Sequence, residues 1–144
     1  IIIRTSWVYS QFGKNFVKTM IRLMNEKESI GVVSDQIGSP TYAADLAEAI
    51  LRMIDRLRTP DFGLRTSLFH FSNHGIISWY EFALAIKEIT GSNCKVNPIA
   101  TSQYPTPAKR PAFSVLDTSK WISTFGLELK PWKESLSICL DRLS

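Results

Sequence analysis

The sequence has little that would place the protein in a membrane or outside the cell. None of its apolar runs approaches the ~20 residues that a membrane-spanning helix needs, and it opens with no charged-then-apolar segment of the secretory type. Its two cysteines, Cys94 and Cys139, are far apart and match no metal or redox spacing. We therefore expect a cytoplasmic protein with two reduced thiols and no membrane partner.

Motifs of common chemistries are also missing. The seven glycines are isolated, so there is no glycine-rich dinucleotide-binding turn, and there is no nucleophile elbow of the G-x-S-x-G type. No His and Cys cluster suggests a metal, and no carboxylate pair looks catalytic. His70 and His74 lie in or beside an expected buried strand, where a structural role is the commoner one.

The charge is modestly basic and scattered. Lys and Arg outnumber Asp and Glu by 17 to 13, which makes the net charge +4. This excess favours an anionic ligand such as a phosphate, or it belongs to the basic half of a longer, balanced chain. The basic residues form no stripe, so we expect no nucleic-acid partner.

What is present is an alternation of strands and helices, which predicts an α/β sheet. The run Ile1-Ile2-Ile3 is typical of a strand buried on both faces, as in a parallel sheet. The expected strands cover about 1–9, 30–33, 68–72, 95–100 and 114–117. The expected helices cover about 16–28, 42–57, 78–91, 118–125 and 131–143.

Local signals set the expected ends of these helices. Asn15, Thr41 and Asp117 are expected helix caps, and Ser78 with Glu81 forms the pattern of a capping box. The second helix should stop at Pro60 and Gly63, and later helices at Gly91 and Gly126. The stretches 34–42 and 104–113 are expected loops, the second because it holds three prolines.

Three stretches carry a resemblance to a known family. They are "RTSWVYSQFGKNFVKTMIRL", "VVSDQIGSPTYAADLAEAI" and "YPTPAKRPAFSVLD". They resemble dTDP-4-dehydrorhamnose reductases, which are extended short-chain dehydrogenase/reductases, and they stand in the same order as in that family. The similarity extends over nearly the whole chain.

The resemblance implies that the chain is the C-terminal half of such a reductase. Its fold would be the C-terminal part of a Rossmann-type parallel sheet plus a small α+β substrate-binding lobe. About 1–12 and 41–91 would be sheet elements, and about 30–40 and 95–144 the lobe. The glycine-rich turn and the catalytic Tyr-x-x-x-Lys would lie in the missing N-terminal half, which is then a partner. The exposed sheet edge that remains suggests a homo-oligomer.

The implied activity is reduction of dTDP-4-dehydrorhamnose to dTDP-L-rhamnose by NADPH or NADH, for cell-surface polysaccharide synthesis. This half would mainly hold the dTDP-sugar, and alone it should bind no cofactor and show no turnover. Two alternatives stay open. One is a non-catalytic regulatory subunit of the methionine adenosyltransferase type, and the other is a reductase of another nucleotide sugar.

By the same resemblance, three residues would bind the substrate. Trp7 would pack on the sugar, although it could be a core tryptophan. Asn15 would contact the diphosphate at a helix N-terminus, although it could be a simple cap. Arg110 would pair with a phosphate, although it could be a surface arginine.

Other residues are weaker candidates. By fold analogy alone, Thr5 and Ser6 would lie near the nicotinamide. Tyr104 and Gln36 are further candidates without an assigned role. No cofactor-binding residue and no metal ligand is assigned.

Overall fold

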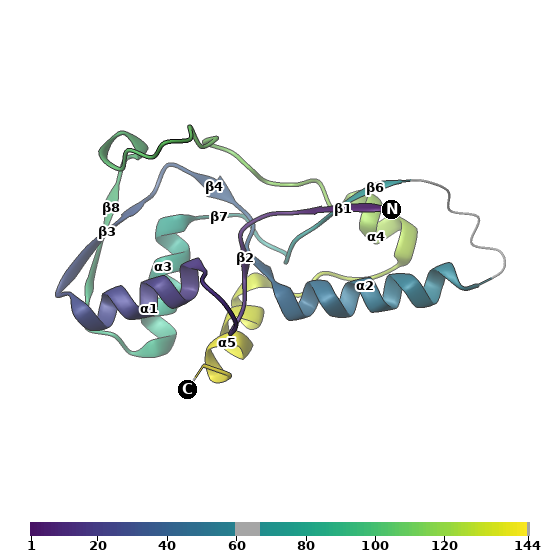
Figure 1. The fold of residues 1–144 in the computed structure, drawn as a ribbon, viewed down its shortest axis with the longest axis horizontal. Helices are drawn as coiled ribbons and strands as arrows, with labels where there is room; N and C mark the ends of the chain where they lie inside the picture. The colour runs from purple at the N-terminus through teal and green to yellow at the C-terminus, as the bar shows by residue number, and fades with distance from the viewer. Residues whose placement is uncertain (60–66, 144) are drawn as a thin grey trace.

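The computed structural model describes residues 1–59 and 67–143 and has a mixed α/β fold (Figure 1). Within the described residues, three pairs of strands are parallel and one is antiparallel. The parallel pairs confirm the predicted α/β class. They are β1 (Ile2–Thr5) with β6 (Leu68–Phe71), β2 (Val8–Tyr9) with β5 (Thr41–Tyr42), and β3 (Ser29–Val33) with β8 (Lys95–Ile99); β4 (Ile37–Gly38) and β7 (Ile77–Ser78) are antiparallel.

Five α-helices and one short 3-10 helix connect these strands in the described ranges. The helices are α1 (Phe16–Glu26), α2 (Ala43–Leu57), α3 (Trp79–Thr90), α4 (Ser119–Phe125) and α5 (Trp132–Asp141), with η1 (Thr101–Gln103) as the 3-10 turn. Figure 1 shows α2 extending away from the β3–β8 pair, with α1 and α3 close to that pair.

The first strand differs from its prediction in two ways. It is interrupted at Trp7, whose φ of +47° is uncommon for a residue with a side chain. It is also not buried on both faces, because Ile1 and Ile2 are 47% and 61% exposed. The reason is that β1 has a strand neighbour on one side only, β6, within the described residues.

Several helix ends are as predicted. Asn15 caps α1 by accepting from the Lys18 N–H, and Ser78 and Glu81 form the capping box of α3. Gly91 and Gly126 end α3 and α4 in the left-handed conformation, which glycine adopts without a steric penalty.

Other local predictions are wrong. Thr41 does not cap α2: it belongs to β5, Tyr42 is the cap residue, and the Thr41 hydroxyl accepts a hydrogen bond from Thr5. The expected loop 34–42 therefore contains β4 and β5, because distant strands pair with it. The expected strand 114–117 does not form. Pro60 and Gly63 lie outside the described residues.

The start of α4 also lies slightly later than predicted. The cap position is Thr118, although the carboxylate of Asp117 does accept from the Ser119 N–H at 2.9 Å. The last helix begins after Pro131, as expected.

The apolar interior forms two clusters. The larger joins α1, α3 and α5 to β3 and β8, around residues such as Val17, Phe82 and Leu136. The smaller lies between α2, β6 and α4, around Phe69 and Trp121. The predicted division into sheet elements and a lobe stays a prediction, but α3 packs with β3 and β8, and α4 packs with β6.

Two general features bear on function. In the described part of the chain no helix is long and apolar enough to cross a membrane, and no group of three or more His, Cys, Asp or Glu could hold a metal.

Cys94 and Cys139 are buried and free. Burial raises the pKa of Cys139 to about 11, so this thiol stays protonated at neutral pH.

Candidate functional site

The turn after β1 is held in place by contacts to a distant segment. The Thr5 hydroxyl donates to the Thr41 hydroxyl at 3.0 Å, and the Ser6 hydroxyl donates to the Ser39 carbonyl at 2.8 Å. The Thr41 N–H donates to the carbonyl of Trp7 at 3.2 Å. These bonds hold Trp7 at its positive φ, and unusual backbone conformations of this kind cluster at functional sites.

The indole of Trp7 is fixed by an aromatic neighbour. It stacks on Trp79, with ring centroids 3.6 Å apart and an interplanar angle of 12°, and Phe16 packs against Trp79 at 4.6 Å. A side chain at Gly38 would meet the Trp7 ring at 2.5 Å, so only glycine fits there. Trp7 is thus half-buried, with one face of its indole ring packed against neighbouring residues.

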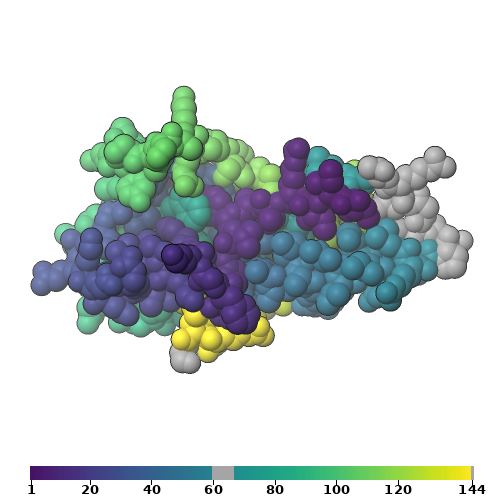
Figure 2. All heavy atoms as spheres, in the orientation of Figure 1, coloured from purple at the N-terminus to yellow at the C-terminus, as the bar shows by residue number. Residues whose placement is uncertain are grey.

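Trp7 borders a small hollow that adjoins a larger one. The first, which we call the Trp7 hollow, has a volume of about 160 Å³. The second, the α1–β3 groove, has a volume of about 360 Å³ and a mainly apolar wall. Gln36, Trp79 and Arg110 line both, so the two hollows meet at these residues. Figure 2 shows the loop after η1, in green, as a ridge at the top of the molecule in this view.

Arg110 is available to a ligand. It lies in the exposed proline-rich loop and borders both hollows. Across residues 1–59 and 67–143 its guanidinium has no hydrogen-bond or ion-pair partner. An unpaired guanidinium beside a cavity is suited to a phosphate, which it can bind through two parallel hydrogen bonds. Tyr104, from the same loop, borders the groove and is 58% exposed.

Asn15 is not brought to this site. Its side-chain oxygen accepts from the Lys18 N–H at 3.2 Å, and its amide nitrogen donates to the carbonyl of Ser10 at 2.7 Å. It borders neither hollow. These contacts are those of a simple cap, and its proposed role toward a diphosphate stays a prediction.

Three residues in or behind the site were not predicted from the sequence: Trp79 borders both hollows, and Asp35 and Thr101 lie behind Gln36. Trp79 follows a capping box and looks like any core aromatic of an amphipathic helix. Asp35 and Thr101 are joined by a 2.6 Å hydrogen bond from the Thr101 hydroxyl. This bond and the Thr101 N–H hold the pKa of the Asp35 carboxyl below its usual value. No sequence signal connects residues so far apart.

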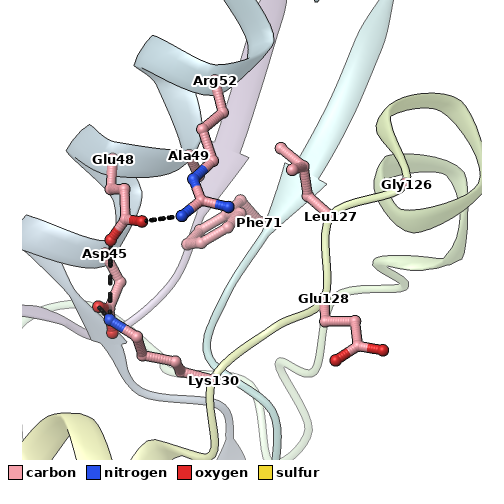
Figure 3. A pocket seen from close by; sticks show the side chains of 9 residues that line it. All are labelled: Asp45, Glu48, Ala49, Arg52, Phe71, Gly126, Leu127, Glu128 and Lys130. Carbon is pink, nitrogen blue, oxygen red and sulfur yellow. Dashed lines mark hydrogen bonds and ion pairs between the residues drawn. The ribbon is translucent and has the colours of Figure 1, made fainter.

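A third hollow, of about 320 Å³, is lined by charged side chains (Figure 3). Four of its five charged side chains are paired with one another, and the exposed Glu128 is the one without a hydrogen-bond or ion-pair partner in the described ranges. Lys130 lies 3.0 Å from Asp45 and 3.7 Å from Glu48, and Arg52 lies 2.6 Å from Glu48. None of the residues predicted to bind substrate borders this hollow. We call it the ion-pair hollow.

The titratable rings of the chain do not look catalytic. The hydroxyl of Tyr9 is buried and has no hydrogen-bond partner in the described ranges, and burial raises its pKa. A tyrosine in this environment is a poor proton donor. The Nδ1 atom of His70 lies 3.2 Å from the carbonyl of Asp117, and the backbone of His74 bridges Pro131. The His70 ring thus contacts the backbone, whereas the His74 side chain is exposed, and their structural role stays a prediction.

Comparisons with known proteins agree on one family. The profile described as RmlD substrate binding domain matches residues 1–144. A dTDP-4-dehydrorhamnose reductase of Sinorhizobium fredii is 44% identical over 138 residues, which is 93% of this chain and 47% of that protein. The Bacillus subtilis protein named "Spore coat polysaccharide biosynthesis protein SpsK" is 45% identical over 143 residues, 99% of this chain and 47% of that protein.

Solved structures of proteins named dTDP-4-dehydrorhamnose reductase superpose on the chain. The crystal structure of the Bacillus anthracis dTDP-4-dehydrorhamnose reductase in complex with NADP superposes with a TM-score of 0.87 and 38% identity. The match covers 99% of this chain and 48% of the other. The chain therefore spans about half the length of the relatives it matches, and its fold is that of the corresponding half of a Rossmann-like reductase.

Proposed function

This chain belongs to the RmlD substrate binding domain family, and on that basis we propose that it is the nucleotide-sugar-binding half of an NAD(P)H-dependent dTDP-4-dehydrorhamnose reductase. The reaction would reduce the C4 ketone of dTDP-4-dehydrorhamnose to dTDP-L-rhamnose. The names of the relatives support this activity and do not favour a regulatory subunit of the methionine adenosyltransferase type.

The observation that carries the proposal is an unpaired arginine beside a fixed tryptophan in one hollow. The exposed face of Trp7 offers an apolar surface to a deoxyhexose ring. Arg110, where the two hollows meet, would hold the diphosphate. The apolar α1–β3 groove would then receive the nucleoside. A dTDP-sugar would thus extend across both hollows with its phosphates at Arg110.

We assign no cofactor-binding role to the residues of this chain. The reduction needs a hydride donor, which we propose to be NADPH or NADH, and the Bacillus anthracis relative was solved with NADP. The glycines of this chain form no dinucleotide-binding turn. The hydroxyls of Thr5 and Ser6 already donate to Thr41 and Ser39. We therefore assign no step of hydride transfer to this chain and expect no turnover from it alone.

The free edge of β1 supports a further part of the proposal. Ile2 of β1 and the preceding Ile1 are exposed, and β6 is the one strand partner of β1 in the described ranges. Burying an isoleucine side chain stabilises by about 1.5–3 kcal/mol. Two exposed isoleucines therefore favour packing of another polypeptide segment against this edge. We propose that the cofactor-binding half of the reductase continues the sheet at this edge. A homo-oligomer stays an expectation.

The proposal is tested by measuring NADPH oxidation with dTDP-4-dehydrorhamnose, using the full-length protein. Arg110→Ala should raise the KM for the sugar nucleotide about ten- to a hundredfold, because a hydrogen bond to a charged group contributes about 1.5–3 kcal/mol. Lys109→Ala is the matched control, since Lys109 is an exposed cation next in the chain that borders neither hollow.

Two results would refute the assignment. One is a full-length protein that folds yet turns over no dTDP-4-dehydrorhamnose. The other is turnover by the isolated 144-residue chain above the uncatalysed rate, since that would require a cofactor site and an acid within these residues.

A further inference from the structure

A chain of three side chains ends where the two hollows meet. The Asp35 carboxylate accepts from the Thr101 hydroxyl at 2.6 Å and from the Thr101 N–H at 2.9 Å. The Thr101 hydroxyl oxygen in turn accepts from the Gln36 amide nitrogen at 3.1 Å. Gln36 is only 7% exposed and borders both the Trp7 hollow and the α1–β3 groove.

The direction of each hydrogen bond in this chain is determined. An ionised carboxylate only accepts, so the single hydroxyl proton of Thr101 is donated to Asp35. The Thr101 oxygen is then left as an acceptor, and only the NH₂ end of the Gln36 amide can donate to it. The amide is therefore held with its nitrogen toward Thr101, and its carbonyl oxygen is kept as an acceptor away from Thr101.

This carbonyl oxygen has no partner among the described residues. It is not one of the fully buried atoms that lack a partner in the described ranges, so it is open to the hollow, where a donor on a ligand can reach it. Among the described residues, none of the other side chains at this junction, Trp7, Trp79 and Arg110, donates a hydrogen bond to it. A ligand bound in the hollow could donate a hydrogen bond to the carbonyl oxygen of Gln36.

We propose that Gln36 is a specificity-determining residue, which accepts a hydrogen bond from a hydroxyl of the sugar ring, and that Thr101 and Asp35 are its positioning residues. This inference rests on the proposed function. It assigns the orientation of the hexose to a polar contact, in addition to the apolar contact of Trp7.

The chemistry of the ligand favours a sugar hydroxyl over its other parts. Phosphate oxygens are ionised at neutral pH and carry no proton to donate. The donors of a dTDP-sugar are the hexose hydroxyls, one deoxyribose hydroxyl and the N–H of the thymine. Gln36 borders the same small hollow as Trp7, which is the hollow that we assign to the hexose. The α1–β3 groove, which would take the nucleoside, extends away along α1 and β3 to Leu23 and Gly31.

The test compares two ligands that differ only in the hexose. Binding of dTDP-L-rhamnose and of dTDP to the full-length protein is measured by titration calorimetry. Gln36→Met keeps the length of the side chain and removes the acceptor. It should weaken dTDP-L-rhamnose about tenfold and change dTDP less than twofold. Ser34→Ala is the matched control from the same segment, since the Ser34 hydroxyl donates to the backbone of Ile99.

A second variant tests the positioning role without touching Gln36. Thr101→Val removes the hydroxyl that orients the amide and should weaken dTDP-L-rhamnose about threefold. The pKa of Asp35, followed by NMR, should rise in this variant because its strongest hydrogen bond is lost. Thr101→Ser should restore both values, which a purely structural role for the methyl group would not do.

The outcomes separate this inference from the proposed function. If the wild-type protein binds neither ligand, both are wrong. If it binds both and Gln36→Met binds them equally well, the Gln36 assignment alone is wrong. If Gln36→Met weakens both ligands to the same extent, the acceptor does not serve the hexose and the inference is again overturned.

Discussion

The Trp7 hollow and the ion-pair hollow differ in how many of their polar groups lack a hydrogen-bond or ion-pair partner in the described ranges. In the ion-pair hollow Lys130 and Arg52 are both paired with carboxylates, and Asn73 behind it bonds Asp45 and Ser135. In the Trp7 hollow the Arg110 guanidinium has no partner among residues 1–59 and 67–143, and within these ranges the Gln36 amide is held from one end only.

This difference separates a structural site from a binding site better than charge or volume does. The ion-pair hollow holds more charge and twice the volume, about 320 against 160 Å³. Lys130, Arg52, Asp45 and Glu48 satisfy one another, so apart from the exposed Glu128 the hollow has few free polar groups for a ligand. Unpaired donors and acceptors beside an immobile aromatic ring are what a polar ligand can use. Substitutions in the two hollows should accordingly change different properties.

The largest expected effect is on stability, at the ion-pair hollow. Asn73 is buried, and its side chain accepts from the Tyr42 N–H and donates to Asp45 and Ser135. Asn73→Ala removes the acceptor of the Tyr42 N–H and a buried donor to Asp45, which keeps its bonds from Ser135 and Lys130, and it should lower the free energy of unfolding by about 2–4 kcal/mol. Urea unfolding measures this, with the exposed Asn25→Ala as control. A loss below 0.5 kcal/mol would mean that the network is not what stabilises this region.

The next effect is on activity, at the Trp7 hollow. Trp7→Ala in the full-length reductase removes an aromatic contact to the sugar that contributes about 1–3 kcal/mol. The kcat/KM for the sugar nucleotide should fall about ten- to a hundredfold, and cofactor affinity should change little. Val8→Ala, at the exposed next position, is the control. A sharply lower melting temperature with unchanged kcat/KM at low temperature would show that Trp7 belongs to the core.

Asn15 gives a smaller effect that decides between a cap and a ligand contact. Asn15→Ala should destabilise by about 1 kcal/mol, whereas Asn15→Asp keeps an N-cap acceptor and should cost less. If Asn15 is only a cap, with its amide occupied by Lys18 and Ser10, neither change should alter the KM for the sugar nucleotide more than twofold. A tenfold higher KM for Asn15→Asp alone would instead indicate repulsion of a bound diphosphate.

The smallest effect is a pH dependence at the ion-pair hollow. The hydrogen bond to Asp45 is the main cause that raises the pKa of Lys130. A lysine whose pKa is higher in the folded protein stabilises the fold fully at pH values below its unfolded-state pKa of about 10.4. This stabilisation is lost as the pH rises through the pKa of the folded state. Since Lys130 is 41% exposed, its contribution should be at most about 1 kcal/mol.

Urea unfolding of wild type and Lys130→Met at pH 8 and above pH 11 checks this sign. The difference between the two proteins should be present at pH 8 and shrink at the higher pH. A difference that grows with pH would contradict the assigned pairing. The exposed pair Lys133–Glu88 is a control whose removal should matter little at either pH.

Much of the local structure could be read from the sequence because its causes are local. The capping box of Ser78 and Glu81 joins residues three positions apart, and Gly126 ends α4 through its own backbone freedom. The three stretches from "RTSWVY" to "AFSVLD" were also enough to place the chain in its family. Two of the site residues, Trp7 and Arg110, came from that resemblance and do border one hollow.

Tertiary structure decided what no local pattern contains. The break of the first strand at Trp7 depends on Gly38 and Trp79 lying against the indole ring. The orientation of Gln36 depends on Thr101, which is 65 positions away. Thr41, a plausible cap by its neighbours, is instead drawn into β5 by pairing with β2. A turn or cap is set by interactions along the chain, whereas a site is set by which side chains the fold brings together and which of them it leaves without a partner.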